Sequence, residues 1–385
     1  MATTGTDLSR MREMNQLSIV WALRGNAPST VTELAGRTGL SRPAVDVLVQ
    51  ALVTDGWAEV EDPGASSVVG RPARRYRFRA DAGHVLGIDI GVHKVLVVLS
   101  DLEGNLVRTL RRPVDPDAAP GARLSEVDRV IDDVLRDAGT TPADVWALTV
   151  GVTGPVDAAG RTSISTPLPG WTAADPVSHL AARFSCPIQV ENDCKLSAVA
   201  ERWNGVAQDA DDIVFLLAGL RTGAGLILDG TLRRGHGGAA GEIGALKAVR
   251  WLSAPGHLQS CPGVPASAAP GDAAAWVFQA ARDGDRDARA AVRRYTRDLA
   301  VGVAALVLTL DPQVVVYGGG FSRSADVVVE PLRRELTKHC LRLPDLRVST
   351  LGDESVAMGA VRLALDEVDS RLLSDGLSAP TAPRR

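Results

Sequence analysis

Two helical patterns separated by a short turn lie near the N-terminus. Thr30 is followed three residues later by Glu33, the spacing of a helix start in which side chains and backbone cap each other. A second helix is predicted after Ser41, since apolar residues recur there at the spacing of one helical face and the chain turns at Gly39 and Gly56. These apolar positions are Val45, Leu48, Val49 and Leu52.

The second helix has a polar face opposite its apolar one. Two helices joined by a tight turn, the second with a polar front that begins at a capping serine, are typical of a helix-turn-helix whose second helix enters the major groove of DNA. The candidate DNA-contacting residues of this helix are Ser41, Arg42, Pro43, Asp46 and Gln50. A small three-helix packing unit remains the alternative interpretation.

The flanking segments extend this unit into a winged helix. An amphipathic helix is predicted for 11–24, and two short alternating strands, 57–60 and 75–79, are predicted on either side of a flexible tip. Five arginines and no acid lie between Val69 and Arg79. Of these, Arg71, Arg74 and Arg75 are candidates for contact with phosphate or the minor groove, although a charge run is often only a solvated surface.

After residue 80 the pattern changes to buried strands that alternate with amphipathic helices. Repeated hairpins and crossover helices in two halves predict two α/β lobes with a cleft between them. The predicted strands are 85–89, 95–100, 147–152, 188–191, 213–217 and 314–317, and the predicted helices are 124–138, 195–203, 285–310 and 356–368. The expected domains are 1–80 and 84–370, followed by a disordered tail at 374–385.

Polar residues mark one candidate ligand site. Asn192 and Asp193 follow a predicted strand and precede a helix, the place where open α/β sheets bind ligands. Glu242 lies in a glycine-dense loop, 235–244. The alternative for Asn192 or Asp193 is a purely structural role as the cap of the following helix.

Charge and composition indicate which partners the protein has and in which compartment it is expected. Residues 1–80 carry 10 basic and 8 acidic side chains, whereas the remainder carries 32 basic and 38 acidic ones. This asymmetry suits a DNA-binding module on a body that must not adhere to DNA. No secretion signal or membrane span is apparent, and the four cysteines lack C-x-x-C spacing, so a cytoplasmic protein without a disulfide framework is expected.

Several motifs together resemble the ROK family, which contains sugar kinases and winged-helix bacterial repressors. They are Thr38–Pro43, Gly70–Ala73, Gly87–Gly91, Glu191–Asp193, Ala240–Gly244 and Gly318–Gly320. The resemblance implies a two-lobed actin-like, hexokinase-like ATPase fold and a homodimer or homotetramer. It also implies that Asn192, Asp193 and Glu242 bind the hydroxyl groups of a sugar or sugar-like effector.

The departures from the family pattern argue against kinase chemistry. Val92 and His93 stand where the family's first phosphate loop has glycine and threonine, and Leu220 and Arg221 precede the second loop. We therefore expect no catalytic residues and no cofactor.

The resemblance also implies two losses around the sugar and zinc sites. Ala245 replaces a zinc-binding histidine, and the cysteine loop is reduced to His257 and Cys261, so no metal is expected. Pro167 stands where the family often has asparagine near the sugar.

These observations predict a transcriptional regulator, expected to be a repressor of carbohydrate-related genes, with double-stranded operator DNA and a small-molecule effector as partners and no membrane. The alternatives are an ATP-dependent sugar kinase and a ligand-independent DNA binder.

Overall fold

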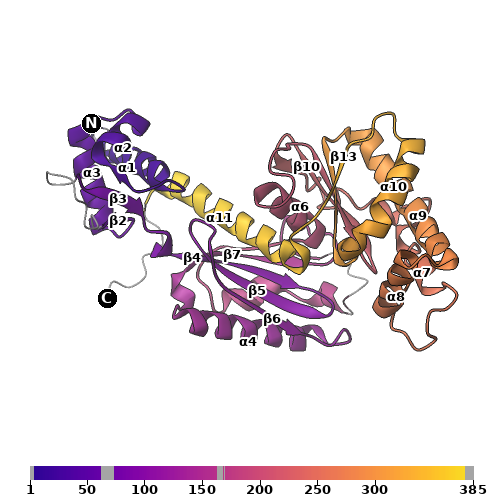
Figure 1. The fold of residues 1–385 in the computed structure, drawn as a ribbon. Coiled ribbons are helices and arrows are strands. Elements are labelled where there is room, and N and C mark those ends of the chain that lie inside the picture. The colour runs from indigo at the N-terminus through magenta and orange to yellow at the C-terminus, as the bar shows by residue number, and fades with distance from the viewer. Residues whose placement is uncertain (1–3, 62–72, 163–167, 169, 378–385) are drawn as a thin grey trace, which may run out of the picture.

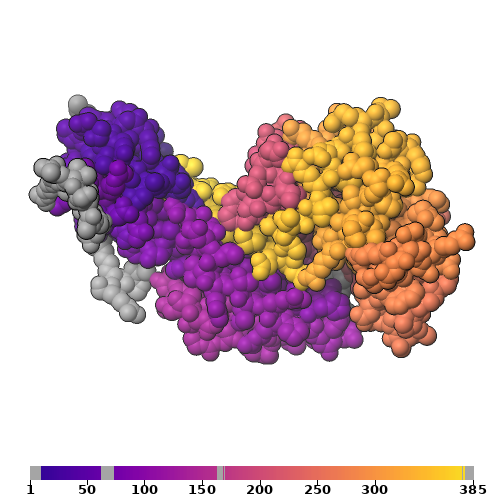
Figure 2. Space-filling model, viewed as in Figure 1, coloured from indigo at the N-terminus to yellow at the C-terminus, as the bar shows by residue number. Residues whose placement is uncertain are grey.

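The computed structural model describes residues 4–61, 73–162, 168 and 170–377. A winged-helix part, a first lobe and a second lobe follow one another along an elongated body (Figure 1). In the space-filling view the winged-helix part rests on the first lobe and stands clear of the second (Figure 2). No helix within the described ranges is long and apolar enough to cross a membrane.

The winged-helix part has the predicted order of elements. They are α1 (Thr4–Leu23), β1 (Ser29–Thr30), α2 (Val31–Thr38), α3 (Arg42–Thr54), β2 (Ala58–Glu61) and β3 (Arg75–Phe78), and the antiparallel sheet has the order β1-β3-β2. The Thr30 hydroxyl accepts the Glu33 N–H at 3.2 Å, and the Glu33 carboxylate accepts the Thr30 N–H at 2.7 Å. Gly39 ends α2 with a φ of 72°, a conformation that favours glycine. Local sequence thus places the turn between α2 and α3.

The first lobe is built on a five-stranded sheet of order β6-β5-β4-β7-β8. Its elements are β4 (His84–Ile90), β5 (Lys94–Asp101), β6 (Leu106–Pro113), α4 (Pro120–Ala138), β7 (Val145–Val152), α5 (Pro176–Ala181) and β8 (Ile188–Asn192). Strands β6, β5 and β4 are antiparallel neighbours, whereas β4, β7 and β8 run parallel. Helix α4 packs on β5 and β6.

The second lobe repeats this topology with the sheet order β11-β10-β9-β12-β13. After the connecting helix α6 (Asp193–Trp203) come β9 (Ile213–Ala218), β10 (Thr222–Leu228), β11 (Thr231–Leu232), α7 (Gly256–Gln259), α8 (Pro270–Arg282), α9 (Arg286–Leu310), β12 (Val314–Gly318), α10 (Ala325–His339) and β13 (Asp345–Val348). The first three strands are again antiparallel and the last three parallel. The predicted two-lobed α/β fold is confirmed.

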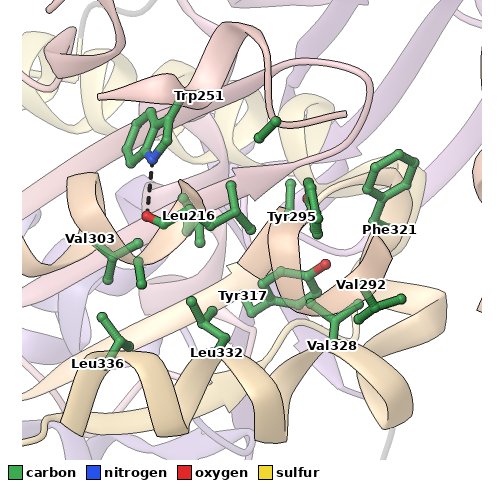
Figure 3. Packing of buried hydrophobic residues seen from close by; sticks show 14 of the residues in the cluster. Leu216, Trp251, Val292, Tyr295, Val303, Tyr317, Phe321, Val328, Leu332 and Leu336 are labelled. Carbon is green, nitrogen blue, oxygen red and sulfur yellow. Dashed lines mark hydrogen bonds between the residues drawn. The ribbon is translucent and has the colours of Figure 1, made fainter. Parts of the chain in front are cut away.

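The core of the second lobe is centred on aromatic side chains from several elements (Figure 3). Trp251 is fully buried, and its indole N–H donates to the Leu299 carbonyl at 3.1 Å. A Cβ on Gly302 would lie only 2.5 Å from the Trp251 ring, so α9 needs glycine at this position. This contact holds the segment before α7 against α9.

The last helix, α11 (Ser355–Asp375), is longer than predicted and joins the first lobe to the winged-helix part (Figure 1). The predicted helix 356–368 and the tail from 374 are corrected, because Ser374 and Asp375 are helical; residues 378–385 lie outside the described residues. The residues after Val368 are mostly polar, so the sequence does not indicate that the helix continues. In the structure, Leu372 is buried and Asp369 is ion-paired with Arg24, the residue after α1.

Several elements were not predicted, among them β6, α8, α10 and β13 and the short elements β1, α5, β11 and α7. Strand β6 lies at the sheet edge with mostly exposed side chains, so it lacks an apolar pattern. Helix α10 contains Pro331, which ordinarily ends a helix. Both elements follow from packing against neighbours rather than from local sequence.

Close glycine contacts place α11 on the first sheet, and this gives a test. A Cβ on Gly87 would lie 2.2 Å from the Ala357 carbonyl oxygen and 2.8 Å from the Val361 nitrogen. We expect Gly87→Ala to destabilise the fold by about 1–3 kcal/mol or more, because β4 and α11 must separate. Chemical denaturation measures this. Gly121→Ala in α4, where a Cβ would meet nothing within 4 Å, is the control and should leave stability unchanged or raise it by up to about 1 kcal/mol.

Candidate DNA interface and effector site

The polar front of α3 is exposed as the sequence predicted. The Ser41 hydroxyl caps the helix by accepting the Ala44 N–H at 3.4 Å, and Pro43 lies in the first turn. The four apolar positions of the helix are buried, while the side chains of Ser41, Arg42, Pro43, Asp46 and Gln50 are exposed. The helix therefore offers a polar ridge that begins at its N-terminus, the geometry that a groove-reading helix needs.

The wing strand β3 lies beside this ridge. Asp46, Gln50, Arg74 and Tyr76 line one shallow hollow together with the start of α2. The Gln50 amide donates to the Tyr76 hydroxyl at 2.7 Å, so this side chain also joins α3 to β3. The structure thus brings Asp46, Gln50 and Arg74 together on one surface.

The other two wing arginines differ from Arg74. Arg75 donates to the Pro28 carbonyl at 2.7 Å and lies 3.5 Å from the Glu33 carboxylate, so its guanidinium fastens the wing to the start of α2. Arg71 lies outside the described residues. A contact of any of these arginines with DNA stays a prediction.

The candidate effector residues Asn192 and Asp193 lie where β8 ends and α6 begins. Asn192 is the helix cap, because its side-chain oxygen accepts the Lys195 N–H at 3.2 Å. Its amide nitrogen donates to the Gly154 carbonyl at 3.1 Å and to Asp193 Oδ1 at 3.0 Å. Asp193 Oδ1 also accepts the Cys194 N–H at 2.8 Å. Asn192 is therefore the helix cap, and Asp193 is the first residue of the helix, where its neighbours Asn192 and Cys194 donate to its carboxylate.

Asp193 is in an unusual electrostatic environment for a carboxylate. Burial and the nearby negative charge of Asp89 raise the pKa of Asp193 to about 6, against hydrogen bonds from Cys194 and Thr153. Asp89 is itself buried at the end of β4, and burial raises its pKa although Lys94 lies 3.0 Å away. The carboxylate of Asp89 in β4 and that of Asp193, the first residue of α6, therefore lie close enough to interact.

Glu242 completes the predicted trio from the second lobe. The Glu242 side chain is exposed, yet desolvation by surrounding protein atoms raises its pKa, and the charge of Lys195 opposes this shift. In the first turn of α6, burial raises the pKa of the Cys194 thiol and lowers the pKa of Lys195, and the negative charge of Glu242 acts on both groups. The three candidate residues are therefore gathered around one helix end, and their contact with an effector stays a prediction.

Sequence reasoning missed the ion pairs and hydrogen bonds between charged residues that hold this site together. Buried Glu191 pairs with Arg234 at 2.5 Å, and the Lys195 ammonium donates to the Gly238 carbonyl. Arg221 interacts with the charge of Asp193. Glu191 and Arg234 are 43 residues apart, so no local pattern reveals the pair.

The loop after β4 is bound by protein groups of the first lobe. Buried Arg123 of α4 donates to the carbonyls of Gly91 at 2.7 Å and Val92 at 3.1 Å. The Gly91 N–H is taken by the Lys94 carbonyl at 2.9 Å. Together with the Lys94 ammonium on Asp89, these contacts do not fit a loop that cradles the phosphates of a nucleotide with its magnesium ion.

The residues present do not fit a zinc site either. His257 Nε2 lies 2.8 Å from the Asp298 carboxylate, and Cys261 is buried in the apolar core of the second lobe. In the part of the chain that the structure describes, no group of three or more His, Cys, Asp or Glu residues is arranged to hold a metal ion. Trp251 and the His257–Asp298 contact hold this loop on α9.

Comparison with known proteins shows the same two-part organisation. The family model described as "ROK family" matches residues 85–263 and 271–367, and one described as "MarR family" matches residues 6–66. A xylose repressor of Caldicellulosiruptor bescii is 23% identical over 389 residues, which cover 93% of this chain and 97% of the relative.

Solved structures agree. A ROK family transcriptional regulator, a homolog of the E. coli MLC protein, superposes with a TM-score of 0.70 at 17% identity and covers 94% of this chain and 98% of that one. A ROK family glucokinase from Streptomyces griseus, in complex with glucose and AMPPNP, reaches 0.62 at 25% identity over 74% of this chain and all of that chain.

The lobes therefore have the kinase-like fold of sugar-binding proteins, attached to a DNA-binding type of winged helix. The chain belongs to the ROK family. The resemblance inferred from the sequence is confirmed.

The raised pKa of Asp193 gives a pH-dependent prediction. The unfolded chain loses this proton near pH 4, whereas the folded chain keeps it to about pH 6, so folding stability falls as the pH rises through this window. Asp193→Asn should remove the loss. Its unfolding free energy relative to the wild type should rise by on the order of 2 kcal/mol between about pH 4 and pH 7. Denaturation at a series of pH values measures this.

Asp157 is the matched control. It is a surface carboxylate whose pKa is lowered by the backbone N–H of Arg161. Asp157→Asn should therefore show no gain over the same window. An equal trend in both variants would contradict the raised pKa of Asp193.

Proposed function

We propose that this protein is a transcriptional repressor whose affinity for operator DNA responds to a sugar. The observation that carries the proposal is the pairing, in one chain, of an exposed polar ridge on α3 with a ROK-type site that keeps Asn192, Asp193 and Glu242. The xylose repressors share nearly the full length of this chain, wing and lobes together. Xylose and related pentoses and hexoses are therefore the first effectors to test.

The effector would bind where β8 meets α6. Carboxylate and amide oxygens accept hydrogen bonds from sugar hydroxyls, and a half-buried carboxylate such as Asp193 makes stronger ones than a solvated group. Glu242 reaches the same helix end from the second lobe, so one polyol in contact with both would hold the lobes together. Such a ligand changes DNA affinity only by the ratio of its affinities for the two arrangements, typically about 1–3 kcal/mol.

A sugar kinase is the second candidate, because ROK glucokinases are also relatives and Asp193, with its raised pKa, suits a general base. The loop contacts of Arg123 and Lys94 favour the repressor. An ATP-coupled assay over common sugars separates the two, and turnover that is lost in Asp193→Asn would reinstate the kinase.

Two copies are expected to act together on DNA. One winged helix buries too little surface to select an operator, so two should occupy half-sites about 10.5 bp or a multiple apart. Light scattering on the free protein and on its DNA complex tests this, and a monomer in both would refute it.

Arg42 provides the test of DNA recognition. After an operator has been selected from random duplexes, Arg42→Ala should weaken binding by about 1–3 kcal/mol and relax the preference at one position, since one bidentate base contact is lost. Arg74→Ala should weaken all sequences and lower the salt dependence. Arg129→Ala on α4, far from α3, is the control. Gel-shift titrations at fixed salt with unchanged affinity for both winged-helix variants would exclude this interface.

Asp193 and Asn192 provide matched variants for the effector site. A sugar at a hundredfold its dissociation constant should add about 2.7 kcal/mol to the stability of the wild type. Asp193→Ala should lose this gain and keep operator binding, whereas Asn192→Ala should cost about 1 kcal/mol of fold stability by loss of the cap. Thermal melting with D-xylose and D-glucose, and operator binding with and without them, give both readouts. A normal sugar response in Asp193→Ala would remove it from the site.

A further inference from the structure

Helix α11 begins at the candidate effector site. Lys94 joins two groups there, because its ammonium lies 3.0 Å from the Asp89 carboxylate and donates to the Asp353 carbonyl at 2.5 Å, just before the helix. The Asp353 carboxylate is held by Arg111 of β6 at 3.1 Å and lies 3.6 Å from Arg323 of the second lobe. The start of α11 is thus tied to both lobes.

The next turns of α11 touch the helix that carries Asp193. A Cβ on Gly359 would lie 1.9 Å from the Leu196 carbonyl oxygen, so α11 and α6 meet at backbone distance three residues beyond Asp193. On its other side, α6 meets the second lobe equally closely. A Cβ on Gly225 of β10 would lie 2.2 Å from the Cys194 carbonyl oxygen. Helix α6 is therefore packed between the second lobe and α11 without room to move independently.

The far end of α11 meets the winged-helix part. One nitrogen of the Arg24 guanidinium donates to the Asp369 carboxylate on α11, and another donates to the Leu102 carbonyl in the turn after β5. In the same turn, Glu103 accepts the Gly25 N–H at 2.9 Å. Ten residues of helix, about 15 Å, separate Gly359 from Asp369. Arg24 thus spans two supports, α11 and the β5–β6 turn.

We propose that α11 couples the effector site to the winged helix, with the Lys94 contacts at one end and Arg24 as the joint at the other. A displacement of α6 moves α11 along the sheet, while the β5–β6 turn stays with the sheet. Arg24 then cannot keep its contacts with both α11 and the β5–β6 turn. Either α1 tilts, or the hydrogen bond of Arg24 to Asp369 or to the Leu102 carbonyl breaks. Packed elements shift between discrete arrangements in this way. The regulatory meaning of the coupling rests on the proposed function, whereas the contacts do not.

Hydrogen exchange on the full chain, without ligand or DNA, tests the coupling. Lys94→Met removes the tether at the effector end. The amides of 17–23 in α1 should then exchange at least about fivefold faster than in the wild type, since the winged helix loses one support. Arg108→Ala, which removes an exposed pair with Asp137 on the same sheet, is the control and should leave α1 unchanged. Faster exchange confined to 84–101 and 352–360 would overturn the proposal.

The reverse experiment starts from the other end. Arg24→Lys keeps the charge but cannot hold both Asp369 and the Leu102 carbonyl. The amides of 355–360, next to the effector site, should exchange faster by a similar factor, while those of 303–307 in α9 keep the wild-type rate. This variant decides the question if Lys94→Met fails to fold, and wild-type exchange at 355–360 would overturn the proposal. A chain that shows both effects but binds no operator DNA would refute the proposed function and leave the coupling standing.

Discussion

The close approach of α11 to β4, β7 and α6 is the constraint on which the rest of the structure depends. Glycines stand at each approach, and a Cβ at Gly87, Gly151 or Gly359 would fall within 2.5 Å of an atom of α11 or α6. Backbone contact of this kind leaves no flexible side chains to absorb movement. The first sheet, the helix that carries Asp193 and the last helix therefore form one closely packed unit, whose parts shift relative to one another only between discrete arrangements. The winged helix docks on that unit through Arg24 and through Trp57, whose ring meets Trp146 edge to face at 5.2 Å.

Charge pairing around α6 separates structural groups from groups that remain available to a ligand. Asp89 has Lys94, and Glu191 has Arg234, so these carboxylates are committed to holding the fold. Within the described residues, Asp193 accepts hydrogen bonds from Cys194, Asn192 and Thr153 and interacts with the charges of Asp89 and Arg221. A carboxylate in this state suits a neutral hydroxyl donor. The adjoining loop is held by Arg123, which donates to the carbonyls of Gly91 and Val92.

In the winged helix, residues of the candidate DNA interface lie beside residues that link its own elements. Arg75 and Gln50 both link elements of the winged helix, although their positions also suit contact with DNA. Arg42, Asp46 and Arg74 have no such role among the described contacts. The division matters because replacement of a linking residue alters the shape of the interface as well as its chemistry, whereas replacement of Arg42 alters the chemistry alone.

The sequence by itself determined the elements whose signals are local. The caps at Thr30 and Ser41, the apolar face of α3 and the strand–helix junction at Asn192 each depend on residues a few positions apart, and the structure contains them as predicted. The tertiary structure decided what depends on distant partners. Arg24 and Asp369 are 345 residues apart, and without that pair the polar end of α11 reads as a tail. Edge strand β6 lacks an apolar pattern, because only its neighbour β5 and helix α4 specify it. The periodicity of apolar residues shows which face of an element is buried. Only the packed structure shows which other element that face contacts.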